Sequence, residues 1–239
     1  MIEKAILKLR ARDVVSTEEE QVLRDAVNRV VEIASDQVVV RAGEELTFSV
    51  LLLDGLMCRY KDLRNGQRQI MELHVPGDFL DLHGFLLKRL DHYVMALVPS
   101  RIAMVPHPRL VAITEQHPHL SRLLWLTTLI DAAIHREWLM SLGRRSAVAR
   151  IAHFFCEMHA RLGVVGLGDA DGFPLKITQT DLAECLGLTS VHVNRTLREL
   201  REAGLAVFRE ARVDILDSAG LKRSAEFDED YLQIDQRPR

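Results

Sequence analysis

Residues 177–203 read ITQTDLAECLGLTSVHVNRTLRELREA, the pattern of two short helices joined by a tight turn. Thr178 or Thr180 can cap the first helix, and Gly187 follows it where the turn needs a positive φ. The apolar face of the first helix consists of Leu182, Ala183 and Leu186, and that of the second consists of Val193, Leu197 and Leu200. These spacings within one segment predict a helix-turn-helix, with an ordinary helical hairpin as the alternative. Thr196 occupies a position that is usually apolar in this motif.

The outer face of the second helix has side chains suited to reading DNA. Arg195 can form a bidentate contact with guanine, Asn194 and His192 can hydrogen-bond to bases or phosphates, and Val191 can pack on a thymine methyl group. Residues near the helix N-termini can donate to phosphate oxygens. From these two helices we expect DNA contacts from Gln179, Thr180, Thr189, Ser190, Val191, His192, Asn194, Arg195 and Arg198.

A short hairpin follows the second helix. Its predicted strands are Leu205–Arg209 and Arg212–Leu216, so that Arg209 and Arg212 lie at the tip and can touch phosphates as a wing does. Three arginines and one acid lie between Thr189 and Arg201. The local charge is therefore positive where DNA would lie, although the chain as a whole has a net charge of -3.

The first half of the chain has a β-rich texture after an N-terminal stretch, residues 1–35, that we predict to be helical. Between Gln37 and Pro106, short apolar runs alternate with turns such as Asp54-Gly55 and Asn65-Gly66. This alternation predicts the hairpins of a β-barrel or sandwich. The predicted strands are Val38–Val40, Val50–Leu53, Met57–Tyr60, Gln69–Val75, Tyr93–Val98 and Arg101–Val105.

A long helix is predicted from Leu120 to about Leu142, where Ser141-Leu142-Gly143 interrupts it. Its apolar stripe is too long for a small β-domain to cover, so a second copy of the chain is the expected partner. The alternative is a helix packed inside its own domain. The predicted dimer interface consists of Leu120, Leu124, Thr127, Ile134 and Trp138.

This order of elements resembles the Crp/Fnr family of transcription regulators. The resemblance covers about residues 35–222 and rests on the turn Gly77–Leu80, on the sequence GLTSVHVNRTL, and on the order of β-domain, long helix, hinge and winged helix. It implies an α+β fold with an N-terminal β jelly-roll sensor domain of the cyclic-nucleotide-binding type, a dimerisation helix and a C-terminal winged helix. The expected boundaries are residues 1–115, 116–142 and 143–222, with a tail at 223–239. It also implies a homodimer, a palindromic operator and contact with RNA polymerase.

The chain departs from the family pattern at the effector pocket. The matching positions are Gly77, Asp81, Leu82, Asp91 and His92. The arginine that pairs with a cyclic phosphate in family members is missing, and Asp91 lies there instead. An anion would be repelled or left unpaired, so we predict that cyclic AMP is not bound. Relatives with an acid at the position of Val191 read cytosine with it, so the usual operator sequence is in doubt.

Other cofactors are not expected either. The chain of 239 residues has three cysteines, and residues 1–35 contain none, so an iron–sulfur cluster of the family type is not expected. Ten histidines suggest a metal or haem site, for example at His153, Cys156, Glu157 and His159, but no complete ligand set is evident. Cys58 beside Arg59 fits either a redox sensor or, more simply, a small buried apolar residue.

We therefore predict a homodimeric DNA-binding transcription regulator that is not an enzyme and needs no metal. No apolar run long enough for a membrane span and no signal peptide is evident, so a cytoplasmic location without membrane contact is expected. The alternatives are a small-molecule or redox sensor whose helix-turn-helix serves protein contacts, and an enzyme of the cupin type, which would need metal ligands on adjacent strands.

Overall fold

A computed structural model describes residues 1–238 of the chain, which form two compact units. The first unit comprises Met1–Lys61, Glu72–Ala132 and the segment from Gln233 onward. The second comprises Asp62–Met71 and Ala133–Leu232. Within residues 1–238, no helix is both long enough and apolar enough to cross a membrane.

Two helices and a strand form the N-terminal stretch. Helices α1 (Glu3–Arg10) and α2 (Thr17–Ala26) confirm the helical prediction, and Ser16 caps α2 in a capping box with Glu19. Residues 29–33 were predicted as helix, which is wrong. They form strand β1 (Arg29–Ile33), which pairs antiparallel with β7 (Ser100–Pro106). Its β-branched residues pair in a ladder, which outweighs the helical spacing of its valines.

Two antiparallel sheets form the β-domain, as predicted. Most of it belongs to the first unit, and the end of the β4–β5 hairpin, Asp62–Met71, belongs to the second. One sheet has the strand order β1-β7-β3 and the other the order β2-β6-β4-β5. The strands not yet bounded are β2 (Val38–Val40), β3 (Phe48–Asp54), β4 (Met57–Asp62), β5 (Arg68–His74) and β6 (Tyr93–Ala96). A short helix, α3 (Gly84–Leu87), precedes β6.

Strand β3 is buried on both faces and therefore belongs to two cores. Val50 and Leu52 lie in the cluster between the two sheets. Leu51 and Leu53 lie in a second cluster with residues of α1, α2 and α4 (His107–Gln116) and with Leu120, Leu123 and Leu124. This second cluster anchors the N-terminal half of the long helix to the β-domain.

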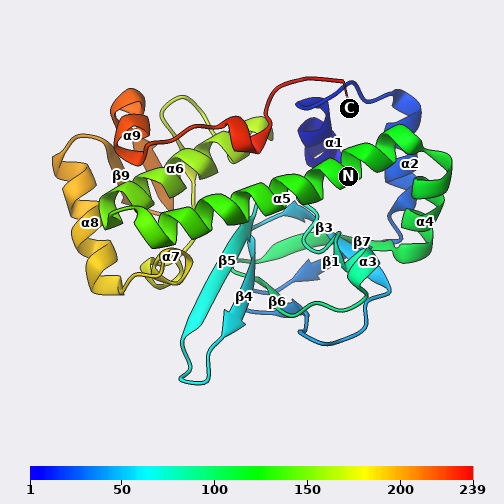
Figure 1. The fold of residues 1–239 in the computed structure, drawn as a ribbon, viewed down its shortest axis with the longest axis horizontal. Coiled ribbons are helices and arrows are strands. Elements are labelled where there is room, and N and C mark those ends of the chain that lie inside the picture. Colours follow the sequence, from blue (N-terminus) through cyan, green and yellow to red (C-terminus); the bar gives the residue numbers. More distant parts are fainter. Residues whose placement is uncertain (239) are drawn as a thin grey trace. The chain divides into compact units, whose positions relative to one another are not determined.

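The long helix α5 (Pro118–Arg144) has 27 residues and runs without a break (Figure 1). The predicted interruption at Gly143 is wrong, because the helix continues through this glycine to Arg144. Nothing lies within 4 Å of where a Gly143 side chain would begin, so this glycine is not required by packing. Helix α6 (Ala147–Val164) follows, and the Ser146 hydroxyl accepts a hydrogen bond from the Ala149 amide at its start.

The rest of the second unit is a winged helix. Helices α7 (Gln179–Leu186) and α8 (Ser190–Glu202) lie where the helix-turn-helix was predicted. The wing strands β9 (Ala206–Arg209) and β10 (Arg212–Ile215) also match the prediction, and β8 (Gly172–Pro174) adds an unpredicted third strand in the order β8-β10-β9. Helix α9 (Ser218–Ala225) and the 3-10 turn Asp230–Leu232 complete it.

Candidate nucleic-acid interface and effector pocket

Side-chain caps and one glycine set the geometry of the helix-turn-helix. The Thr178 hydroxyl accepts from the Asp181 amide at 3.1 Å, and the Asp181 carboxylate accepts from the Thr178 amide at 2.7 Å. Gly187 ends α7 with a φ of 58°, a conformation that favours glycine. The Leu188 amide then donates to the Ala183 carbonyl at 3.0 Å, which closes the turn.

Helix α8 presents one buried and one exposed face. Thr189 caps it by accepting from the His192 amide at 3.2 Å. Val193, Thr196 and Leu200 are buried, so Thr196 packs inside like the apolar residue that the motif usually has there. The predicted contact residues on the outer face are all exposed: Ser190, Val191, His192, Asn194, Arg195 and Arg198. Gln179 and Thr180 are exposed at the start of α7.

A basic groove of about 520 Å³ joins α8 to the wing. Gln179, Asn194, Arg195, Arg198, Arg201 and Arg209 contribute to its lining. Arg195 and Arg198 each form an i,i+4 ion pair on the helix, with Glu199 at 3.5 Å and Glu202 at 2.9 Å. Such exposed pairs are weak, so both guanidinium groups can be redirected to a phosphate or a base. Arg201 was not among the predicted contact residues, although its spacing of three from Arg198 places it on the same face.

The two arginines of the wing differ in their surroundings. Glu210 and Ala211 form the tip with positive φ values of 51° and 57°, so that Arg209 and Arg212 lie opposite each other in the ladder. Arg209 is exposed. Arg212 donates to both carboxylate oxygens of Asp169 at 3.0 Å and to Asp214 at 2.9 Å. The predicted phosphate contact thus fits Arg209, whereas two carboxylates of the same chain hold Arg212.

The tip of the β4–β5 hairpin contacts the helix-turn-helix within the second unit. The Gln69 side-chain amide donates to the Glu184 carbonyl at 2.7 Å and to the Cys185 carbonyl at 3.3 Å. Both carbonyls belong to the last turn of α7, where backbone acceptors lack helical partners. Sequence reasoning missed this contact, because more than 100 residues separate its partners.

The exposed apolar face of α5 is not the predicted one. Leu120, Leu124, Ile134 and Trp138 are at most 6% exposed, because they pack inside the protomer, and Thr127 is half-buried. The predicted interface is therefore wrong for these four buried residues. Helix α5 carries a second row of residues at alternating spacings of four and three, and all of them are exposed or half-exposed. This row, called the α5 seam below, consists of Trp125, Leu129, Ala132, Arg136, Leu139 and Gly143.

The predicted effector-pocket residues do not form one site. Asp81 is buried, and its Oδ1 accepts from the Val50 amide at 2.6 Å. Leu82 packs in the cluster with α1 and α2. The Asp91 side chain is 79% exposed, and its hydrogen bonds with Lys61 and His92 lower its pKa. Gly77 lies against α1, where a Cβ would come within 2.7 Å of the Lys4 backbone.

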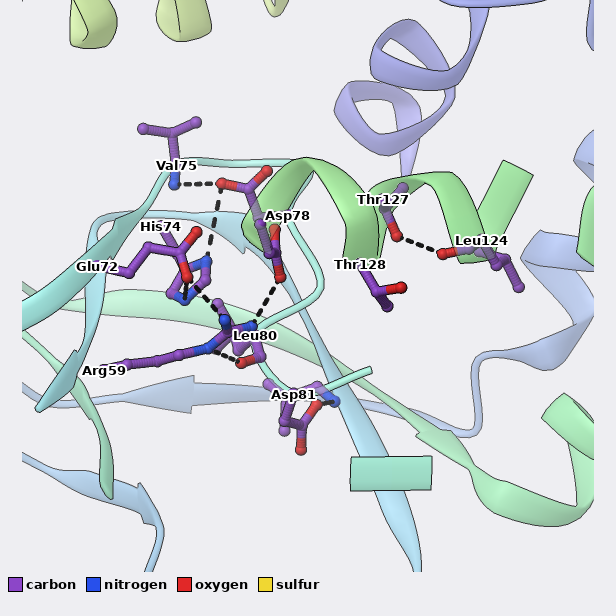
Figure 2. Close-up of polar contacts among 12 residues, drawn as sticks. Arg59, Glu72, His74, Val75, Asp78, Leu80, Asp81, Leu124, Thr127 and Thr128 are labelled. Carbon is purple, nitrogen blue, oxygen red and sulfur yellow. Dashed lines mark hydrogen bonds and ion pairs between the residues drawn. The ribbon is translucent and has the colours of Figure 1, made fainter. Parts of the chain in front are cut away.

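Arg59, which the sequence indicated only as the neighbour of Cys58, lies in the interior of the β-domain. Arg59 of β4 is buried and forms an ion pair with Glu72 of β5 at 2.7 Å (Figure 2). It forms a second ion pair with Asp131 of α5 at 3.0 Å. Neighbouring Cys58 is fully buried, which supports its interpretation as an apolar core residue. The sequence signal was Arg59 inside an otherwise apolar run, where a charge needs a partner.

The candidate metal ligands on α6 are engaged in other contacts. Glu157 is fully buried and accepts from Trp138 at 3.0 Å, Tyr231 at 2.9 Å and Arg161 at 2.9 Å. His153 stacks on Tyr231, and burial lowers its pKa to about 3. In the described part of the chain, residues 1–238, no group of three or more His, Cys, Asp or Glu is arranged to hold a metal ion.

Two protein families match the chain, one for each half. Residues 30–117 match the cyclic nucleotide-binding domain, and residues 149–224 match the Crp-like helix-turn-helix domain. Together, these two matches make the chain similar to Crp/Fnr regulators over both domains. Its order of β-domain, long helix and winged helix is that of Crp/Fnr proteins.

Curated Crp/Fnr relatives cover most of the chain. The nitrogen fixation regulation protein FixK of Bradyrhizobium diazoefficiens is 29% identical over 83% of this chain and 83% of its own length. The transcriptional activator FnrL of Cereibacter sphaeroides is 27% identical over 81% of this chain and 79% of its own. The solved structure of FixK2 from Bradyrhizobium japonicum has a TM-score of 0.74 and 24% identity, and covers 82% of this chain and 96% of that one. This structural likeness supports the fold.

Proposed function

We propose that this protein is a homodimeric transcription regulator of the Crp/Fnr family that reads a palindromic operator with α8. The observation that carries the proposal is the basic groove between α8 and the wing, which combines base-reading side chains with Arg209. Arg195 is the guanine-reading residue of this groove, and Asn194 and His192 are its polar neighbours. Two copies, joined through α5, would present two such helices to successive major grooves.

Several further properties belong to this proposal. The protein acts by binding and not by catalysis, resides in the cytoplasm, and contacts RNA polymerase at its target promoters. It uses no cyclic AMP, haem, iron–sulfur cluster or metal. Against cyclic AMP stands the interior of the β-domain, where Glu72, Asp81 and Asp131 surround the single guanidinium of Arg59. These carboxylates do not fit a cyclic phosphate, because an anion there would lack an unpaired cation.

Selection of binding sites from a random duplex library tests the function, using the full chain without added ligand. We expect a palindrome whose half-sites lie about 34 Å apart, one helical turn of DNA. No enrichment by a folded, dimeric protein would refute ligand-free operator binding and favour a sensor that contacts other proteins.

Two matched variants then test the role of Arg195 on the selected operator. Arg195→Ala should weaken binding by about 1–3 kcal/mol and relax base choice at one position of each half-site. Arg223→Ala removes the same charge from an exposed position of α9, outside the groove, and should leave base choice unchanged. Equal weakening by Arg195→Ala on all sequences would contradict a base contact.

A further inference from the structure

The guanidinium of Arg59 donates three hydrogen bonds inside the β-domain. Its Nε donates to the Leu80 carbonyl at 2.7 Å, its Nη1 to Glu72 at 2.7 Å and its Nη2 to Asp131 at 3.0 Å. Figure 2 shows the Arg59 side chain lying between Glu72 and the Leu80 backbone. Asp131 belongs to α5, so this arginine joins a strand of the β-domain to the long helix.

Three carboxylates lie around the guanidinium of Arg59, and His74 lies 3.7 Å from one of them, Glu72. Glu72 and Asp131 both pair with Arg59, and Asp81 lies close enough to interact with the same cation. Burial raises the pKa of Asp81 to about 7, because its charged form loses water in the interior. An anionic ligand would have to displace a carboxylate from Arg59, at the cost of leaving that carboxylate buried and unpaired.

Stability alone does not explain this ion pair. Well-packed apolar residues often stabilise a core as well as a buried ion pair does, because both charges must lose their water. What a planar guanidinium adds is a fixed direction for each partner. In the sequence, Asp131 lies between Leu129 and Ala132 of the α5 seam. Its ion pair with Arg59 therefore restrains the position and rotation of α5 next to these two seam residues.

We propose that Arg59 is a built-in substitute for an anionic effector: by pairing with Asp131 it holds α5 in the DNA-binding arrangement without a bound ligand. This inference rests on the proposed function and specifies its regulation. Helix α5 carries the seam and leads directly into the second unit, so its setting is a natural point of control. Arg59 acts here as a positioning residue.

The test compares three variants of the full-length protein on the selected operator. Asp131→Asn keeps the shape of the side chain and removes its charge, and Asp131→Glu restores the charge. Asp91→Asn is the control, because it removes an exposed ion pair with Lys61, which lies on the same strand as Arg59, β4. Operator affinity is measured by fluorescence anisotropy, with melting temperature and sedimentation as checks on folding and dimerisation.

We expect Asp131→Asn to bind the operator at least about tenfold more weakly while remaining folded and dimeric, within the usual range of coupling between sites. Asp131→Glu should recover most of the affinity, and Asp91→Asn should behave as wild type. Wild-type affinity should not change on addition of cyclic AMP. Unchanged binding by Asp131→Asn, unfolding of both Asp131 variants, or tighter wild-type binding with cyclic AMP would each overturn the inference.

Amide hydrogen exchange in α5 gives a readout that needs no DNA. Exchange should be faster in Asp131→Asn than in Asp91→Asn, because the helix has lost its charged attachment to the β-domain. Equal exchange in the two variants would overturn the inference even if the site selection itself had failed. Failure of the proposed function and failure of the inference are thereby distinguished.

Discussion

Replacing Trp125 by glutamate should separate the dimer without unfolding the protomer. Trp125 is 64% exposed in the protomer and lies in the α5 seam, with Leu129 one turn further along at 51% exposed. Because so little of this tryptophan packs inside its own chain, its replacement removes few contacts there. The substitution should instead weaken the association of two copies of the chain.

The expected magnitude follows from the exposed area of Trp125. A tryptophan can bury up to about 250 Å², so an exposed fraction of 64% leaves about 160 Å² for a partner. At about 25 cal/mol per Å² this is about 4 kcal/mol per protomer, counted twice in a twofold dimer. Since association costs offset much of such an area-based energy, we expect a net loss of about 3 kcal/mol, or about a hundredfold in the dimer dissociation constant.

Sedimentation equilibrium over a dilution series measures this dissociation constant. Leu86→Glu is the matched control, since Leu86 is 77% exposed on α3 and lies outside the seam. Leu124→Ala tests the other face of α5 and should lower the stability of the protomer by about 2–5 kcal/mol, because Leu124 is buried there. If Trp125→Glu had the dimer dissociation constant of wild type, or if Leu86→Glu weakened the dimer equally, the assignment of the α5 seam as the dimer interface would be refuted.

Three further predictions concern buried charges and the wing. Burial raises the native pKa of Asp81 from 3.8 to about 7, so its ionisation costs stability as pH rises through this range. In urea unfolding, the free energy of unfolding of Asp81→Asn relative to wild type should therefore rise by about 2 kcal/mol between about pH 5 and about pH 8. A free-energy difference that does not change with pH would contradict this prediction. Arg209→Ala should reduce the salt dependence of operator binding by about one phosphate contact, whereas Arg212→Ala, whose guanidinium is held by two carboxylates, should change it little. Tyr231→Phe removes one donor from buried Glu157 and should cost about 1–3 kcal/mol in chemical denaturation; wild-type stability would show that the bond contributes nothing.

Local patterns were sufficient to predict most elements, including both helices of the helix-turn-helix. The strands between Val38 and Val105, the cap at Thr178, and α8 all depend on residues close in sequence. Strand β1 was missed, because its valines also fit a helical spacing and only pairing with β7 decides between the two. The ion pairs of Arg59 could not be predicted, since Glu72 lies 13 residues away and Asp131 lies 72.

The sequence pattern predicts that α5 is apolar on more than one side, but it does not tell which side faces a second copy. The helix carries one apolar row around Leu120, Leu124 and Ile134 and a second around Trp125 and Leu129. A sequence alone does not tell which of two apolar rows packs on its own β-domain, so the stronger row was assigned to the partner. The structure shows the reverse: the stronger row fills the protomer core, and the weaker one remains exposed. A helix with apolar rows on both sides is expected to be buried on both, and in the protomer only one side is, so a second copy is the natural cover for the α5 seam.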